Sequence, residues 1–144
     1  MSYAGILATV NLYKTQKNDL TSDLSDILMN ITDASRQSST LMQQENEDKS
    51  YLREKYTTTQ GEKEDDTTYE LRKSKADAEL KDGMDEIESE FECQLEKIST
   101  WEAELEFQKQ TKETEVQVTS SYLDSFTEVL KNNVKKDFTY GQSK

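Results

Sequence analysis

The sequence predicts an all-α fold, a long antiparallel two-helix coiled-coil hairpin that bends near residues 57–68 and whose C-terminal arm is longer. Apolar residues recur at helical spacing on both sides of a single polar stretch. The chain has no proline and only 4 glycines, so the residues that usually interrupt helices are nearly absent. Its 33% of charged residues against 32% of apolar ones suits helices that each bury one narrow face.

The first arm is predicted over about residues 3–56. Its apolar residues recur at alternating steps of four and three, which is the heptad pattern of a coiled coil. Polar residues at a few of these positions lower stability and could also set the register against a partner. The predicted inner positions are Ile6, Val10, Tyr13, Lys17, Leu20, Leu24, Ile27, Ile31, Ala34, Ser38, Leu41, Glu45, Asp48, Leu52 and Tyr56.

The bend is predicted over residues 57–68, which read TTTQGEKEDDTT and contain no apolar residue. Gly61 is expected to mark the bend, since glycine can adopt the left-handed conformation that closes a helix. Asp65, Asp66 or Thr67 is expected to cap the helix that follows. The alternative is that this stretch is only a polar patch on one unbroken helix, because an internal glycine costs about 1 kcal/mol.

The second arm is predicted over about residues 69–138, followed by a frayed tail at 139–144, so that residues 1–144 form a single helical-hairpin domain. Between Ala76 and Ile98 the apolar spacing follows an eleven-residue repeat, which favours a nearly straight superhelix. After a weak stretch at 108–114, helical spacing resumes with more aromatic residues. The apolar positions of this arm are Tyr69, Ala76, Leu80, Met84, Ile87, Phe91, Leu95, Ile98, Leu105, Val116, Val118, Tyr122, Leu123, Phe126, Val129, Leu130, Val134 and Phe138, and Lys73 and Glu102 continue the pattern.

Folding the chain symmetrically at Gly61 places Tyr56 opposite Tyr69 and Val10 near residues 112–116. Residues 118–138 then find no partner within the hairpin, and several large apolar side chains are unlikely to stay in water. We therefore expect them to pack against another copy of the chain. The alternative is that this segment bends back onto residues 3–13 as a closed three-helix monomer. The predicted self-association residues are Ile6, Val10, Tyr13, Leu20, Leu24, Tyr122, Leu123, Phe126, Leu130, Val134 and Phe138.

The formal net charge of −12 is concentrated in the middle of the chain. Residues 61–115 carry 8 basic and 19 acidic groups, which disfavours nucleic acid and anionic membrane surfaces as partners. The acidic stretch favours a basic protein partner, although such a surface is more often simply solvated. No window approaches the ~20 apolar residues of a membrane-spanning helix.

The sequence contains no arrangement of residues that predicts catalysis. Without histidine it has no imidazole base, no imidazole metal ligand and no Ser-His-Asp arrangement. No glycine-rich phosphate loop or EF-hand spacing occurs. Cys93 has no basic residue within three positions to stabilise a thiolate, so an inert thiol is expected. We therefore expect no enzyme activity, no cofactor and no metal.

The N-terminal stretch MSYAGILATVNLY has no basic residue ahead of its short apolar run, unlike a cleaved signal peptide. Together with the C-terminal stretch TSSYLDSFTEVLKNNVKKDFTYG and the helical hairpin, it resembles the secreted helical subunits of type III secretion filaments and needles. In those families the terminal helices polymerise inside a tube. Needle subunits usually turn at a proline-containing loop, which TTTQGEKEDDTT replaces here.

The resemblance implies a structural, self-assembling subunit of an exported filament or secretion apparatus, secreted without a cleaved signal or held at the cell surface. The resemblance implies other copies of the chain and a secretion chaperone as its partners. The alternative is a cytoplasmic coiled-coil adaptor or chaperone-like module that binds a basic protein partner through the acidic arm.

Overall fold

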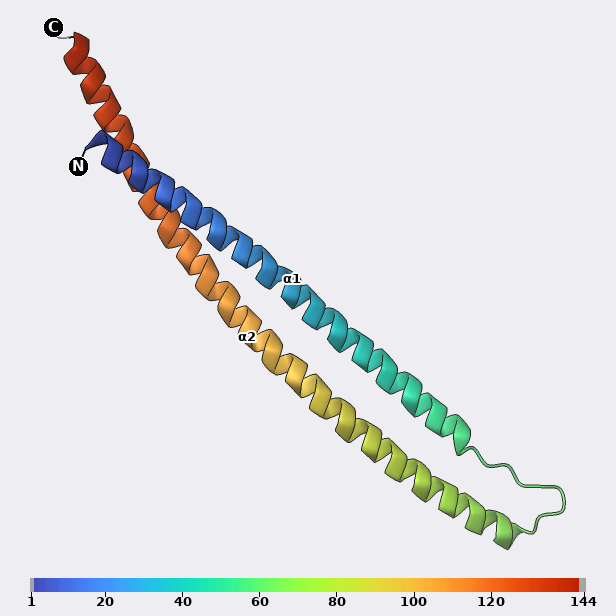
Figure 1. Cartoon of the computed structure of the whole chain (residues 1–144). Coiled ribbons are helices and arrows are strands. Elements are labelled where there is room, and N and C mark those ends of the chain that lie inside the picture. Colours follow the sequence, from blue (N-terminus) through green and yellow to red (C-terminus); the bar gives the residue numbers. More distant parts are fainter. Residues whose placement is uncertain (1, 143–144) are drawn as a thin grey trace. The chain divides into compact units, whose positions relative to one another are not determined.

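The computed structural model describes the backbone of residues 2–142 and the side chains of residues 2–136. Two helices, α1 (Tyr3–Lys55) and α2 (Asp66–Gln142), are joined by a loop of residues 56–65 (Figure 1). Residues 2–142 contain no strand. The predicted fold class, a helical hairpin with a longer C-terminal helix, is confirmed.

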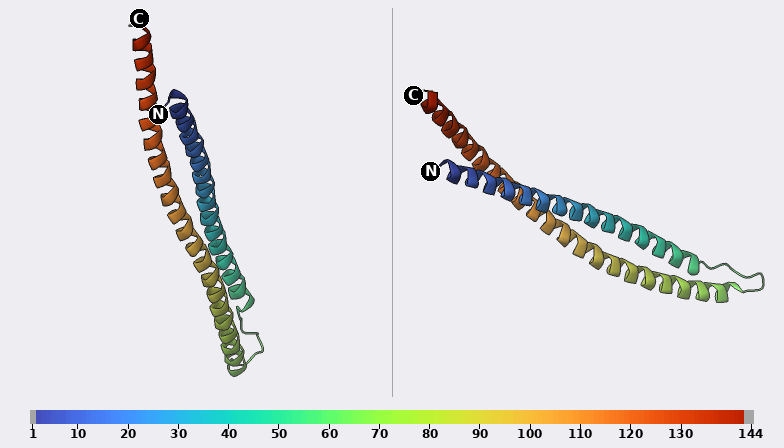
Figure 2. Two further views of the ribbon diagram at one scale, coloured as in Figure 1. Left: turned by 60° about the vertical axis from the view of Figure 1, so that its left-hand side comes forward. Right: turned by 45° about the horizontal axis from the view of Figure 1, so that its top comes forward.

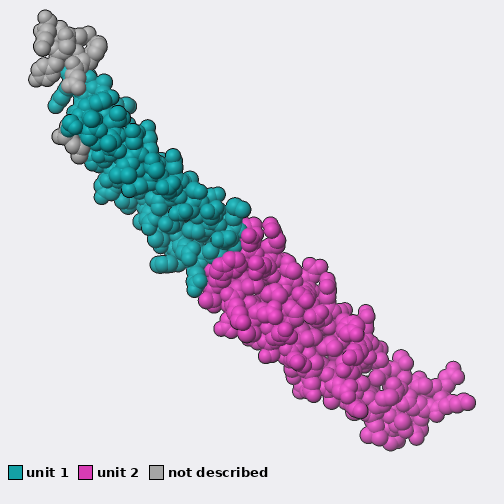
Figure 3. Space-filling model, viewed as in Figure 1, with its two compact units in different colours: residues 1–31, 104–144 teal, residues 32–103 magenta. Residues whose placement is uncertain are grey.

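The chain divides into two compact units, each built from one stretch of each helix (Figure 3). Unit 1 comprises residues 1–31 and 104–144, and unit 2 comprises residues 32–103. In unit 1, an ion pair joins the two helices, with Lys112 Nζ 3.6 Å from Asp23 Oδ2. In unit 2, another joins them, with Lys49 Nζ 3.1 Å from Glu88 Oε1. The helices run antiparallel in both units, and Figure 2 shows the C-terminal end of α2 extending past the N-terminal end of α1 in unit 1.

Local hydrogen bonds fix both ends of α1. The Ser2 hydroxyl accepts a hydrogen bond from the Gly5 amide at 3.1 Å, so Ser2 caps the helix. At the other end, the Thr57 hydroxyl donates to the Arg53 carbonyl at 2.7 Å, and the Thr57 amide donates to the Glu54 carbonyl at 3.3 Å. These bonds satisfy carbonyls that have no partner within the helix, so the chain can leave the helical path after Lys55.

The inner face of α1 is the one that the heptad pattern predicts. Every predicted inner position, the polar ones included, is buried or half-buried, and Ile6, Val10, Ile27 and Ala34 are the most deeply buried apolar ones. On α2, Phe91 and Leu105 are buried. Lys73, by contrast, is exposed, so its predicted inner position is wrong. Its position falls where α1 has already ended.

A network of hydrogen bonds attaches the loop to the first turns of α2. Arg72 donates to both carboxylate oxygens of Glu64, at 3.0 and 2.8 Å, and to the Thr59 carbonyl at 2.8 Å. The Gly61 amide donates to the same Glu64 carboxylate at 3.1 Å. Asp65 caps α2, since its carboxylate accepts a hydrogen bond from the Thr68 amide at 2.6 Å, as predicted for one of three candidate caps.

Gly61 lies within the loop, but its predicted left-handed conformation is wrong, because no glycine in the described backbone has a positive φ. A side chain at Gly61 would meet only Glu64, at 3.7 Å. The ten-residue loop between Lys55 and Asp66 is long enough to reverse the chain without a left-handed residue.

The symmetric register expected from the sequence is also wrong. Tyr13 of α1 contacts Tyr122 and Phe126 of α2, well beyond the 112–116 region that was expected near Val10. In unit 2, Leu52 lies against Gly83. An extended loop advances about 3.3 Å per residue and a helix only about 1.5 Å, so α2 begins beyond the end of α1. The expectation that residues 118–138 lack a partner within the chain therefore fails for Tyr122 and Phe126.

The boundaries of α2 also differ from the predicted arm. The helix begins at Asp66 instead of near residue 69, because Asp65 supplies the cap. It continues through Gln142, so the backbone of 139–142 is helical where a frayed tail was expected. No proline forces it to end earlier. Residues 143–144 lie outside the described part, and α2 does not bend back as a third helix.

Gly83 gives a test of helix packing in unit 2. A Cβ at this position would lie 2.9 Å from Leu52 Cδ1, the movable end of a half-buried side chain. Gly83→Ala should therefore change the free energy of unfolding by less than about 1 kcal/mol, since the gain in helix propensity offsets a small shift of Leu52. Gly83→Leu should destabilise by about 1–3 kcal/mol through overpacking. Urea unfolding followed by circular dichroism measures the free energy of unfolding of both variants. Equal changes for the two substitutions would contradict close packing of Gly83 against Leu52.

The loop network predicts a dependence on pH. The Arg72 hydrogen bond lowers the pKa of Glu64 below its usual 4.5, and the Thr68 amide lowers the pKa of Asp65 below its usual 3.8. Because both pKa values are depressed, the network is complete above pH 4.5 and is lost as the pH falls through the folded-state values. The NMR shifts of the Gly61 and Thr68 amides report the two carboxylates separately.

Arg72→Gln should raise the midpoint of the Gly61 transition toward 4.5 and leave that of Thr68 unchanged. If the midpoint of the pH-dependent change in the Gly61 amide shift is the same in both proteins, Arg72 is not what lowers the pKa of Glu64.

Candidate self-association surface

Apart from Phe138, the predicted self-association residues fall into three groups by burial. Ile6 and Val10 are buried within the chain, with 1% and 3% of their surface exposed. Tyr122 and Val134 are exposed. The side chain of Phe138 lies outside the described residues. The others are half-buried, namely Tyr13, Leu20, Leu24, Leu123, Phe126 and Leu130.

An aromatic stack joins the two predicted stripes inside one molecule. The Tyr13 ring lies 5.6 Å from the Tyr122 ring and 5.6 Å from the Phe126 ring, with interplanar angles of 19° and 21°. Tyr122 and Phe126 are one helical turn apart, so Tyr13 packs on both. Tyr13, Tyr122 and Phe126 were expected to contact another copy of the chain. In the structure they contact each other within one chain.

From Leu105 onward the inner face of α2 follows a strict heptad. Burial alternates at steps of four and three through positions 109, 112, 116, 119, 123, 126 and 130, which we label a and d of the heptad. The weak stretch at 108–114 is part of this run, because Lys109 and Lys112 occupy inner positions and remain half-buried.

Two apolar surfaces remain exposed on the flanks of this inner face. The first, the outer stripe, consists of Val118, Tyr122 and Val129, which occupy heptad positions c and g and are 48%, 51% and 43% exposed. The sequence analysis placed these residues in the same set as the inner ones, because apolarity alone does not separate position g from position a. Thr119, a buried polar residue, takes an inner position beside exposed Val118.

The second surface, the lysine-edged groove, lies on the opposite flank of α2. It is a shallow, mostly apolar groove at positions a, b, e and f, lined by Thr127, Leu130, Lys131, Val134 and Lys135. The same flank carries Phe107, whose side chain is 71% exposed. The sequence analysis missed Phe107, although its f position, away from the inner face, could have identified it as an outward aromatic residue.

Unit 2 carries most of the charge. It holds 10 basic and 20 acidic residues, a net charge of −10, whereas unit 1 holds 8 and 10, a net charge of −2. Apart from Met42, Tyr51 and Leu71, the exposed large apolar side chains that the structure describes belong to unit 1. Exposed apolar surface and acidic surface are thus segregated between the two units.

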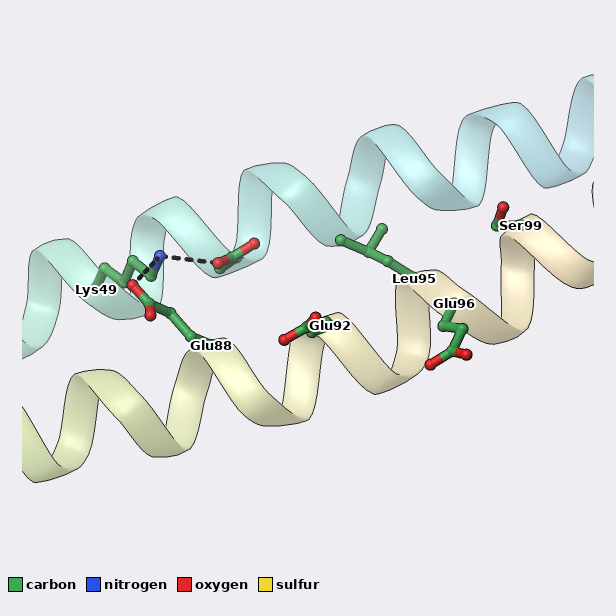
Figure 4. Close-up of a pocket in the computed structure, with 7 residues that line it drawn as sticks. Lys49, Glu88, Glu92, Leu95, Glu96 and Ser99 are labelled. Carbon is green, nitrogen blue, oxygen red and sulfur yellow. Dashed lines mark hydrogen bonds and ion pairs between the residues drawn. The ribbon is translucent and has the colours of Figure 1, made fainter.

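An acidic groove in unit 2 is the strongest concentration of this charge. Lys49 Nζ lies 2.9 Å from Glu45 Oε1 and 3.1 Å from Glu88 Oε1. Figure 4 shows that Leu95 points toward α1 and that Glu96 points away from it. The hydrogen bonds that Lys49 donates to the Glu45 and Glu88 carboxylates raise the pKa of Lys49 above its usual 10.5. The groove is lined by Glu45, Lys49, Glu88, Glu92, Leu95, Glu96 and Ser99. It offers carboxylates to a basic partner.

Cys93 is exposed and unpaired with another cysteine. Within the described residues, no three acidic or cysteine side chains converge as a metal site. In that same part of the chain, neither helix has a stretch long and apolar enough to span a bilayer. Comparison with known protein families, with curated proteins and with solved structures finds no match to this chain.

The aromatic stack predicts a local contribution to stability. Tyr13→Ala should lower the free energy of unfolding by about 2–4 kcal/mol, since it removes a half-buried ring and two ring contacts. Tyr13→Phe should be nearly neutral, because the ring makes the contacts. The neighbouring Leu12→Ala, at a 55% exposed position, should cost less than about 0.5 kcal/mol. Thermal unfolding at one fixed protein concentration measures the series, and equal losses for Tyr13→Ala and Leu12→Ala would refute the stack's contribution.

Proposed function

We propose that this chain is a structural, self-assembling helical subunit of an exported filament or secretion apparatus, without enzyme activity. The observation that carries the proposal is the outer stripe of Val118, Tyr122 and Val129, which remains 43–51% exposed although the Tyr122 ring stacks on Tyr13 of α1. Each such side chain gains about 1.5–3 kcal/mol when it is fully buried, so a second copy that covers the stripe is favoured.

The amount of exposed surface supports the same conclusion. The chain has 10816 Å² of accessible surface. A compact monomer of 16.6 kDa has roughly 7600 Å². Two helices bury only one face each, so most of the remaining burial has to come from other molecules.

The near-neutral charge of unit 1 is compatible with close packing of copies there. With a net charge of −2 it meets little electrostatic self-repulsion, whereas unit 2, at −10, would repel its own kind. This favours assembly through unit 1 with unit 2 directed to solvent. The first part of α1 and the last part of α2 belong to unit 1, and terminal helices are the polymerising elements in the secretion filaments that the sequence resembles.

The alternative is a cytoplasmic adaptor or chaperone-like module for a basic protein. The observation that favours it is the acidic groove of unit 2, where carboxylates flank Leu95 and Lys49 offers the only positive charge in the groove's lining. A partner segment with basic residues could pair with the groove's carboxylates while an apolar residue packs on Leu95. The negative charge of unit 2 would raise the association rate of such a segment.

Sedimentation velocity over a concentration series tests the proposal. We expect the wild-type chain to assemble as concentration rises. The double variant Val118→Asp with Val129→Asp should raise the concentration needed for assembly at least tenfold, since two apolar contacts become charged. Tyr51→Asp is the matched control, because Tyr51 is a 65% exposed apolar residue of unit 2 and should leave assembly unchanged.

A wild-type chain that stays monomeric up to millimolar concentration would rule out self-assembly. If that chain also binds a synthetic lysine-rich amphipathic peptide, and Glu88→Lys with Glu92→Lys abolishes the binding, the adaptor function gains support instead.

A further inference from the structure

We propose that two copies of the chain pair antiparallel along α2, each placing its Phe107 in the lysine-edged groove of the other. The inference rests on the proposed self-assembly and specifies one of its contacts. Phe107 is the most exposed of the large apolar side chains that the structure describes, at 71%. The groove, lined by Leu130, Val134 and the stems of Lys131 and Lys135, is a mostly apolar recess on the same helix.

The heptad places the aromatic ring and the groove on one side of α2. Because the inner face from Leu105 to Leu130 repeats every seven residues, residues separated by four heptads have the same orientation relative to α1. Glu106 and Val134 are related in this way, and so are Phe107 and Lys135. The ring of one copy and the groove of another can therefore face each other while α1 of each copy stays on its inner face.

The charges select the partner. The edge of the groove carries Lys131 and Lys135, so two grooves would repel each other. The surface beside Phe107 carries Glu106, which is half exposed and makes only a 3.9 Å ion pair with Lys109. Docking Phe107 in the groove brings Glu106 to the lysine edge, and it brings the Lys131 ammonium to the ring face, where a cation–π contact adds to the attraction.

Antiparallel pairing satisfies both contacts in one dimer. Phe107 and Lys131 lie about 35 Å apart along α2. When Phe107 of the first copy meets the groove of the second, Phe107 of the second meets the groove of the first, and the two-fold axis passes near residue 120. The side chains there are small, Ser120 and Ser121, which allows the helices to approach. The outer stripe lies on the other flank of α2, so it remains available for a different contact.

The residues replaced in this test are exposed, so their substitution should change dimerisation without disturbing the inner face or the fold. Phe107→Ser should weaken dimerisation about a hundredfold or more, because each dimer loses two buried rings. Leu71→Ser is the matched control, since Leu71 is 69% exposed but belongs to unit 2, and it should have no effect. Lys131→Glu and Glu106→Lys should each weaken the dimer, and their combination should restore it. Sedimentation equilibrium measures the dimer dissociation constant of the wild-type chain and of these five variants.

A cysteine cross-link tests the two-fold axis. In a Cys93→Ser background, Ser121→Cys should form a disulfide-linked dimer on mild oxidation, whereas the same substitution at Leu71 should not. Wild-type assembly that Phe107→Ser does not change would overturn this inference and leave the proposed function standing. A strictly monomeric wild-type chain would overturn both, and a failed Ser121→Cys cross-link with an active Phe107 would exclude the antiparallel pairing.

Discussion

The arrangement depends on one constraint, that α1 and α2 each have a single partner helix and can cover only one face of it. Buried apolar side chains are consequently few and spread along the inner faces, from Ile6 and Val10 in unit 1 to Ala34 and Phe91 in unit 2. Polar residues such as Ser38 and Glu45 occupy inner positions without being fully enclosed. Stability therefore comes from many shallow contacts in series, with local reinforcement where Tyr13 stacks on α2.

Periodicity predicted the heptad positions of the inner face of α1, all of which are buried or half-buried, because the step between them depends only on helix geometry. Leu28 and Met42, which were expected to widen that face, are exposed. Local residue chemistry located the loop and gave Asp65 as one of three candidate caps. Neither predicted the axial offset of the helices. That offset depends on the length of an extended loop held by Arg72 and Glu64, a set of contacts between residues whose pairing no spacing rule specifies.

The candidate surface was only partly accessible to sequence analysis for the same reason. Once the offset is known, Ile6, Val10, Tyr13 and Phe126 become parts of one intramolecular contact. The exposed remainder lies at flank positions, where Val118 and Tyr122 face one way and Phe107 another. Hydrophobicity identified Tyr122 and Val134 as candidates, but the distinction between inner and outer positions at 105–130 required the observed burial pattern. The concentration of negative charge in the middle of the sequence, in contrast, carried over directly to unit 2.

The seven-residue repeat that α1 shares with residues 105–130 of α2 also restricts how the chain can change in length. An insertion of one residue within α2 would rotate everything after it by about 100°, turning Leu123 and Leu130 out of the inner face. Additions or losses of whole heptads nearly preserve the orientation, and a matching change in α1 is needed to keep residues such as Tyr13 opposite Phe126. A change of one residue in the loop of residues 56–65, by contrast, leaves the phase within each helix unchanged.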